Sequence, residues 1–129
     1  MIAVDASILI AHLDPGDAHH AAARQVLTEA VTAPLIAHGL TLAEVLVGGV
    51  RVHRGAEMLA DLHGIGVRLA PRDDGEPLRL AGLRVETGLR LPDCCVLLTA
   101  VVNGATLATF DDGLARAARR LRIPVLPTA

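Results

Sequence analysis

Lysine, tryptophan and tyrosine are absent from this chain of 129 residues. Among Phe, Trp and Tyr, the chain contains only Phe110. All 12 basic residues are therefore arginines, and every mechanism that needs a catalytic lysine is excluded. The core has to be built from Leu, Val, Ile and Ala. The aromatic stacking platforms on which many single-strand nucleic-acid binders rely are also missing.

Cysteine is nearly absent as well. Cys94 and Cys95 are neighbours on an expected helix and point apart, so they predict neither a disulfide nor a metal pair, and a reducing cytoplasm fits best. No apolar run approaches the ~20 residues of a membrane span. Residues 1–13 lack the cationic start of a signal peptide. We therefore expect a cytoplasmic protein with no membrane partner.

Hydrophobic residues make up 52% of the chain and charged residues 20%. This composition predicts one packed domain over residues 1–129 rather than a disordered chain. The net charge of −2 gives no global attraction to nucleic acid. Any polyanion would have to be held by local clusters of arginine.

Short apolar strands alternate with helical patterns along the whole sequence. We expect helices over 6–13, 17–31, 41–49, 54–63, 76–88, 93–103 and 114–121, and strands over 1–5, 34–38, 65–70, 106–111 and 124–127. Asp17 is expected to cap the helix that ends near residue 31, and Thr41 is expected to begin the next helix. Gly48-Gly49 should weaken the C-terminal end of that second helix. This alternation predicts an α/β fold with a mainly parallel sheet of four or five strands. Ligands of such sheets bind beyond the carboxyl ends of the strands.

The segment 92–112 brings two acids to that edge. A helix of about ten residues is roughly 15 Å long, and a strand of five or six residues covers a similar ~17–20 Å on the way back. The two ends are therefore level, and we expect Asp93 beside Asp111. Asp5, at the carboxyl end of the first strand, should lie at the same edge.

Each acid also has a purely local explanation. Asp5 and Asp93 could be helix caps, and Thr41 with Glu44 fits the capping box Thr-x-x-Glu. Asp111-Asp112-Gly113 could be an ordinary capped turn, but caps do not require several acids to converge on one edge. Converging carboxylates repel one another, and a hard divalent cation such as Mg²⁺ or Mn²⁺ would offset that repulsion. The sequence therefore favours a metal site.

Four segments then occur in the order and spacing of PIN domains: Asp-Ala-Ser-Ile-Leu-Ile-Ala (5–11), Thr-Leu-Ala-Glu-Val-Leu-Val-Gly (41–48), Leu-Pro-Asp (91–93) and Thr-Leu-Ala-Thr-Phe-Asp-Asp (106–112). The chain resembles a VapC-type toxin ribonuclease of a toxin–antitoxin pair. The resemblance covers nearly the full length and is weakest over 50–90. No single motif is specific, but the ordered set of four is.

The resemblance implies a PIN-like three-layer α/β/α fold and an Mg²⁺- or Mn²⁺-dependent endoribonuclease. It also implies a VapB-like antitoxin as partner and a homodimer. The family's catalytic and metal-binding acids correspond to Asp5, Glu44, Asp93 and Asp111. Asp112 could share or replace the role of Asp111, because the doubled aspartate blurs the match.

The mechanism we predict is hydrolysis of an RNA phosphodiester by metal-activated water. Ser7 and Thr109 would fix the orientation of the carboxylates, although local backbone bonding also explains both hydroxyls. Three arginines on the last helix could bind RNA phosphates near the site or simply form a solvated face that complements the helix dipole: Arg116, Arg119 and Arg120.

Other functions fit the sequence less well. A receiver domain and a haloacid-dehalogenase-type phosphatase both need a lysine, which is missing. The spacing of His12, His19 and His20 matches no closed zinc site. The alternative that remains is a catalytically idle PIN-like module that binds RNA or protein. A metal titration followed by an RNA cleavage assay separates it from a nuclease.

Overall fold

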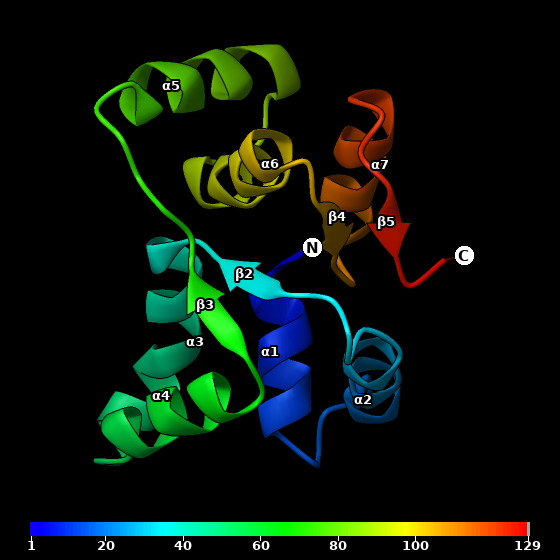
Figure 1. The fold of residues 1–129 in the computed structure, drawn as a ribbon. Helices are drawn as coiled ribbons and strands as arrows, with labels where there is room; N and C mark the ends of the chain where they lie inside the picture. Colours follow the sequence, from blue (N-terminus) through cyan, green and yellow to red (C-terminus); the bar gives the residue numbers. More distant parts are fainter. Residues whose placement is uncertain (129) are drawn as a thin grey trace.

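Residues 1–128 are described by a computed structural model, shown as a ribbon in Figure 1. Strands and helices alternate along the chain as the sequence indicates. Their bounds are β1 (Ile2–Val4), α1 (Ala6–Leu13), α2 (His20–Glu29), β2 (Leu35–Ala37), α3 (Gly39–Arg51), α4 (Gly55–Gly64), β3 (Val67–Leu69), α5 (Glu76–Thr87), α6 (Leu91–Asn103), β4 (Thr106–Ala108), α7 (Asp112–Arg120) and β5 (Val125–Leu126).

The five strands form one parallel sheet in the order β3-β2-β1-β4-β5. Ile2 of the central strand β1 is in register with Leu35 of β2 and Thr106 of β4. Because all the strands run the same way, their carboxyl ends share one edge. This confirms the α/β class and the parallel sheet, with the proline-flanked β5 at an edge.

Helices cover both faces of the sheet, so the three-layer architecture is confirmed (Figure 1). Alternate residues of β1 point to opposite faces. Ile2 and Val4 belong to one core, which is completed by buried side chains of α1, α2, α3 and α4. Ala3 belongs to the second core, built with α6 and α7. Helix α5 packs on the outside of α6.

Four helices begin two or more residues away from the expected position, and one of them is α7, which begins at Asp112 rather than Leu114. Helix α2 begins at His20 rather than Asp17, because the Asp17 carboxylate accepts a hydrogen bond from the His19 amide in the preceding turn. Helix α3 begins at Gly39 rather than Thr41, and α6 begins at Leu91 rather than Asp93. These shifts matter for the site, because they change which side chains are caps.

The two consecutive glycines do not end α3. The helix continues to Arg51, and Gly49 is buried where α4 crosses it. A Cβ atom at this position would overlap the sulfur of Met58. Gly49 therefore permits close helix packing instead of breaking the helix. Within residues 1–128, no helix is both long and apolar enough to cross a bilayer.

Candidate active site

Four acidic residues from distant parts of the sequence meet at the carboxyl edge of the sheet. Asp5 follows β1, and Asp111 follows β4, the neighbour of β1. Glu44 lies in the second turn of α3, and Asp93 lies in the first turn of α6. The expected proximity of Asp93 and Asp111 is visible in their electrostatics, because the charge of Asp111 raises the pKa of Asp93.

Asp5 is the most firmly held of these acids. Its side chain is buried, and Oδ1 accepts a hydrogen bond of 2.8 Å from the Ala6 amide. Oδ2 accepts hydrogen bonds from the Ser7 hydroxyl at 2.9 Å and the Thr109 hydroxyl at 2.7 Å. Three hydrogen bonds, from the Ala6 amide and from the Ser7 and Thr109 hydroxyls, therefore fix the orientation of the carboxylate.

The same two hydroxyls tie the end of β1 to the loop that carries Asp111. Ser7 Oγ accepts a hydrogen bond of 3.0 Å from the Phe110 amide. Thr109 Oγ1 accepts one of 3.0 Å from the Asp111 amide. Each hydroxyl thus donates to Asp5 and accepts from the β4–α7 loop. Backbone bonding and contact with the carboxylate therefore occur together at both hydroxyls.

The pKa values of Glu44 and Asp93 are both raised where the acids gather at this edge. Burial raises the pKa of Glu44, and the charges of Asp5 and Asp93 raise it further. Burial likewise raises the pKa of Asp93, with added contributions from Asp111 and Asp5. Arg90 acts in the opposite direction on both pKa values. The four carboxylates are therefore close enough to repel one another.

Capping accounts for only two of the four acids. Asp5 caps α1, and Asp111 caps α7 by accepting a hydrogen bond of 2.9 Å from the Leu114 amide. The capping explanation of Asp93 is wrong, because the cap of α6 is Arg90 and Asp93 lies inside the helix. A helix-internal carboxylate that is repelled by its neighbours needs another explanation.

The capping box of Thr41 and Glu44 is also wrong. His38 is the cap of α3, and its Nδ1 accepts a hydrogen bond of 3.0 Å from the Leu40 amide. Thr41 is therefore inside the helix, and its buried hydroxyl has no hydrogen-bond partner within the part of the chain that the structure describes. Glu44 lies farther along α3 and caps nothing.

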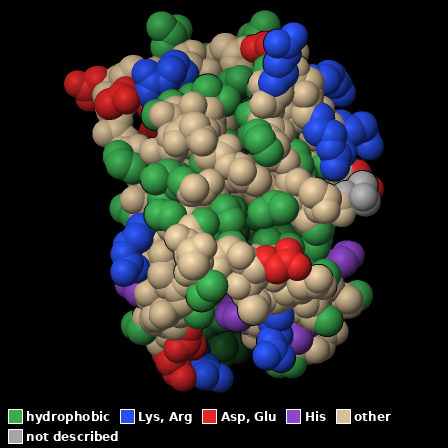
Figure 2. All heavy atoms as spheres, turned by 45° about the vertical axis from the view of Figure 1, so that its right-hand side comes forward, with side chains coloured by type: hydrophobic (Ala, Val, Ile, Leu, Met, Phe, Trp, Pro, Cys, Tyr) green, Lys and Arg blue, Asp and Glu red, His purple; other side chains and the backbone are tan. Residues whose placement is uncertain are grey.

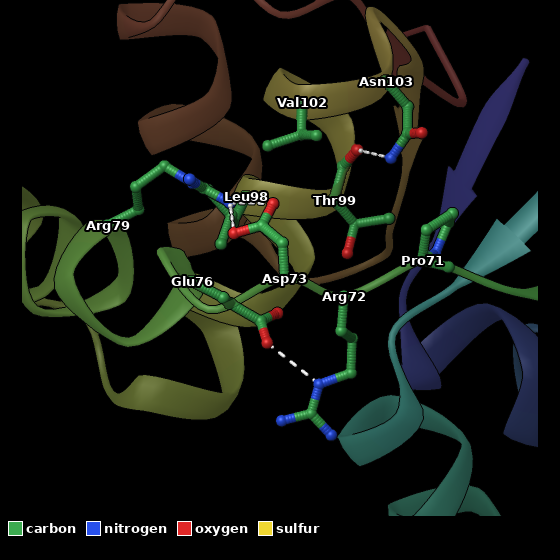
Figure 3. Close-up of a pocket in the computed structure, with 10 residues that line it drawn as sticks. Pro71, Arg72, Asp73, Glu76, Arg79, Leu98, Thr99, Val102 and Asn103 are labelled. Carbon is green, nitrogen blue, oxygen red and sulfur yellow. Dashed lines mark hydrogen bonds and ion pairs between the residues drawn. The ribbon is translucent and has the colours of Figure 1, made fainter.

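His38 belongs to a buried polar link that the sequence did not reveal. Its Nε2 lies 2.6 Å from Oε1 of Glu76, the first residue of α5, and Arg72 Nε donates to Oε2 of Glu76 at 2.9 Å. Figure 3 shows Arg72 pointing to Glu76 beside a small cavity. That cavity holds only about 20 Å³, room for a single water molecule, and no rim acid lines it.

The residues at the rim fit a hard divalent cation in their donor chemistry. All four offer carboxylate oxygens, which Mg²⁺ and Mn²⁺ prefer. Burial raises the pKa values of Glu44 and Asp93, and the charges of neighbouring carboxylates raise them further, as a site that gathers negative charge requires. Within residues 1–128, however, no three His, Cys, Asp or Glu side chains form a ready metal cluster. The acids share one edge without forming a closed ligand set.

The remaining candidates lie on α7. Asp112 is exposed in the first turn of this helix, and it is Asp111 whose charge raises the pKa of Asp93. Figure 2 shows arginine side chains gathered in the part of the molecule that α7 occupies. The three arginines of this helix are exposed: Arg116, Arg119 and Arg120.

Sequence reasoning missed three contributors to the site. Arg90 lies one helical turn before Asp93, so its place at the same helix end was a usable signal. His38 directly follows β2 and so lies at the carboxyl edge, which was a second signal. Nothing local marked Glu76 as the partner of His38.

Comparison with known proteins agrees with this geometry. The PIN domain model matches residues 2–120. The solved structure of VapC20 from Mycobacterium tuberculosis, a toxin that cleaves the sarcin–ricin loop, is 19% identical with a TM-score of 0.75, covering 91% of this chain and 95% of that chain. A toxin–antitoxin complex from Klebsiella pneumoniae is 30% identical with a TM-score of 0.66, covering 85% of each chain.

A structure from Pyrobaculum aerophilum has 19% identity and a TM-score of 0.61, covering 90% of this chain and 83% of that chain. No curated protein sequence matches the chain. The family match spans nearly the whole sequence and all four rim acids, and the fold of the toxin structures is shared. The chain belongs to the PIN domain family.

Proposed function

We propose that this protein is a metal-dependent endoribonuclease, the VapC-type toxin of a toxin–antitoxin pair. One observation carries the proposal: four carboxylates converge on the carboxyl edge of the sheet, where burial and the charge of neighbouring acids together raise the pKa values of Glu44 and Asp93. Neither Glu44 nor Asp93 has a capping role that would explain its position. The similarity to VapC20, a toxin that cleaves the sarcin–ricin loop, supports RNA as the substrate.

In this proposal the four rim acids would hold Mg²⁺ or Mn²⁺. The bound cation would supply an activated water and stabilise negative charge on the phosphodiester. Asp5, fixed by Ser7 and Thr109, presents its carboxylate in one orientation. Glu44 and Asp93 take up protons more readily than ordinary carboxylates, so protons compete with the cation at this rim.

The arginines of α7 would hold the RNA backbone. Because the net charge is −2, attraction to a polyanion has to come from a local cluster. Arg116, Arg119 and Arg120 form such a cluster on the helix that Asp111 caps. Their guanidinium groups match phosphate geometry. We propose phosphate contacts, not base recognition, as their role.

The partners follow from the same comparison. The solved complex from Klebsiella pneumoniae is a toxin–antitoxin pair, and the similarity supports a VapB-like antitoxin as partner of this chain. A homodimer is part of the proposal through the family resemblance. Two free buried thiols fit a reducing compartment such as the cytoplasm.

The decisive experiment is an RNA cleavage assay with purified protein, with and without Mg²⁺ or Mn²⁺. Asp5→Asn should abolish cleavage, because the amide keeps the size of the side chain but removes its charge. Asp74→Asn, which changes an exposed acid in the loop before α5, should cleave normally. Full cleavage by Asp5→Asn, or cleavage that a chelator leaves unchanged, would contradict the proposal. RNA binding without cleavage would favour the idle binding module.

A further inference from the structure

Phe110, the only Phe, Trp or Tyr residue of this chain, is partly buried against a core and also stacks on a histidine at the rim. The rings of Phe110 and His19 are nearly parallel, with their centroids 4.7 Å apart and their planes inclined by 18°. Phe110 directly precedes Asp111, whereas His19 comes from the loop before α2. The two rings therefore bring separate parts of the chain together beside a rim acid.

Both rings are held in place by the elements around them. The Phe110 amide donates to Ser7 Oγ, which in turn donates to Asp5. The His19 amide donates to Oδ1 of Asp17 at 2.8 Å. Phe110 is partly buried against the core, while 61% of the His19 side chain is exposed. The pair thus presents a histidine ring to solvent from a fixed support.

A cavity of about 290 Å³ adjoins this stack. Its lining includes both rings, the carboxylate-bearing residues Asp111 and Asp112, and Arg119 of α7. This volume lies just below the range of about 300–1,000 Å³ that is typical of pockets for small ligands. The lining offers what a nucleotide needs: a ring for the base and a guanidinium group for a phosphate.

We infer that His19, supported by Phe110, is the platform on which one base of the RNA substrate stacks next to the cleaved bond. This inference rests on the proposed nuclease function and adds a binding site for a nucleobase. Proteins recognise single-stranded RNA by stacking unpaired bases on aromatic and histidine rings. Arg119, in the same cavity, would contact the phosphate of that nucleotide.

The test uses short single-stranded RNAs with 2-aminopurine at successive positions, mixed with the full chain in EDTA so that metal-dependent cleavage is blocked. The chain has no Trp or Tyr, so the probe can be excited without protein emission. Quenching at one position, with about 10-fold weaker binding and no quenching in His19→Ala, is the expected result. His19→Phe should restore both, because it keeps a ring.

His63→Ala removes an exposed histidine from α4 and is the matched control. Thermal unfolding of every variant separates loss of the platform from loss of the fold. In the cleavage assay, His19→Ala should raise KM about 10-fold and leave kcat unchanged. His19→Phe should have the KM of the wild type. An abasic nucleotide at the quenched position should remove the difference between wild type and His19→Ala.

The outcomes distinguish this inference from the nuclease proposal. Quenching that depends on His19, without cleavage in Mg²⁺ or Mn²⁺, would support the platform and contradict the nuclease. Cleavage with the same KM in His19→Ala and wild type would overturn the platform and leave the nuclease standing. Equal binding and quenching in wild type and His19→Ala would also overturn it. A wild-type protein that neither binds nor cleaves RNA would overturn both.

Discussion

The imidazole of His38 and the carboxylate of Glu76 form a buried pair, with Nε2 and Oε1 separated by 2.6 Å. His38 Nδ1 accepts a hydrogen bond from the Leu40 amide, so the ring proton lies on Nε2. The Nε2–H group therefore donates a hydrogen bond to Glu76. The pair therefore connects the first residue of α5 to the start of α3, the helix that carries Glu44. It thereby fixes the beginning of the helix on which Glu44 lies.

We expect Glu76→Gln to destabilise the fold by about 1–3 kcal/mol at pH 7. Burial acts to raise the pKa of Glu76, but hydrogen bonds from Arg72 and His38, together with the charge of Arg72, bring it below the usual glutamate value. A lowered folded pKa gives stability that is present above the unfolded pKa and is lost as the pH falls through the folded pKa. Urea unfolding at pH 7 and at acidic pH measures both effects.

In the Glu76→Gln variant the loss of stability on acidification should be smaller than in wild type. Glu86→Gln, on the exposed side of the same helix, should behave like wild type at both pH values. An acid-dependent loss as large in Glu76→Gln as in wild type would show that this pair does not contribute to pH-dependent stability.

Asp93→Asn should abolish cleavage yet make the protein more stable at neutral pH. The raised pKa of Asp93 means that the folded state binds its proton more tightly than the unfolded state. The cost of ionising this carboxyl is therefore fully present above the folded pKa and disappears in acid. We expect a gain of about 0.5–1 kcal/mol. Thermal unfolding compares it with Asp74→Asn, for which no gain is expected.

Mg²⁺ should stabilise the wild-type protein and stabilise the rim variants less. A ligand that binds only the folded state adds about 2.7 kcal/mol at 100 times its Kd. Removing a carboxylate from the set weakens binding, so Asp5→Asn and Asp93→Asn should need higher Mg²⁺ concentrations for the same shift in Tm. Equal Mg²⁺-dependent shifts in wild type and both variants would place the cation elsewhere.

Thr109→Val should lower kcat by about 10- to 100-fold, the effect typical of residues that orient metal ligands. The substitution removes the donor to Asp5 and the acceptor for the Asp111 amide without changing the volume of the side chain much. Thr109→Ser keeps the hydroxyl and should restore both kcat and the Mg²⁺ dependence. A kcat as high in Thr109→Val as in Thr109→Ser would show that the hydroxyl is not needed.

Two glycines should respond to alanine in opposite directions. Gly104 ends α6 with a φ of 58°, which alanine adopts poorly, so Gly104→Ala should cost about 1 kcal/mol. Gly82 lies inside α5 with nothing within 4 Å of an added Cβ. Gly82→Ala should therefore stabilise the protein by about 0.5–1 kcal/mol. Chemical denaturation of both variants measures the contrast.

Regular patterns in the sequence were sufficient to predict the fold and the convergence of the rim acids. The alternation of apolar strands and amphipathic helices determines a parallel sheet. The return from Asn103 through β4 and the loop after it brings Asp111 close enough to Asp93 for its charge to add to the raised pKa of that carboxyl. The end of α6 at Asn103-Gly104 is also determined by local sequence, since Gly104 caps the helix in the left-handed conformation. Each of these inferences depends on neighbours within about one helix or strand.

Sequence reasoning failed where the decisive partner is distant in the chain. His38 displaces Thr41 as the cap of α3, and its own position depends on Glu76 of another helix. The sequence indicates no aromatic stacking platform in a chain whose only Phe, Trp or Tyr residue is Phe110, and it does not predict that the His19 ring stacks on Phe110. Neither pairing leaves a periodic or spacing signal that could be followed along the sequence.

The adjacent thiols of α6 have a practical consequence. Cys94 and Cys95 are both buried, and burial raises the pKa of Cys95 to about 11. In the native state neither sulfur is a ready nucleophile, so an alkylating reagent can react only after α6 has opened. Because the same helix carries Asp93, the rate of alkylation measures how often α6 opens and moves this acid away from the rim.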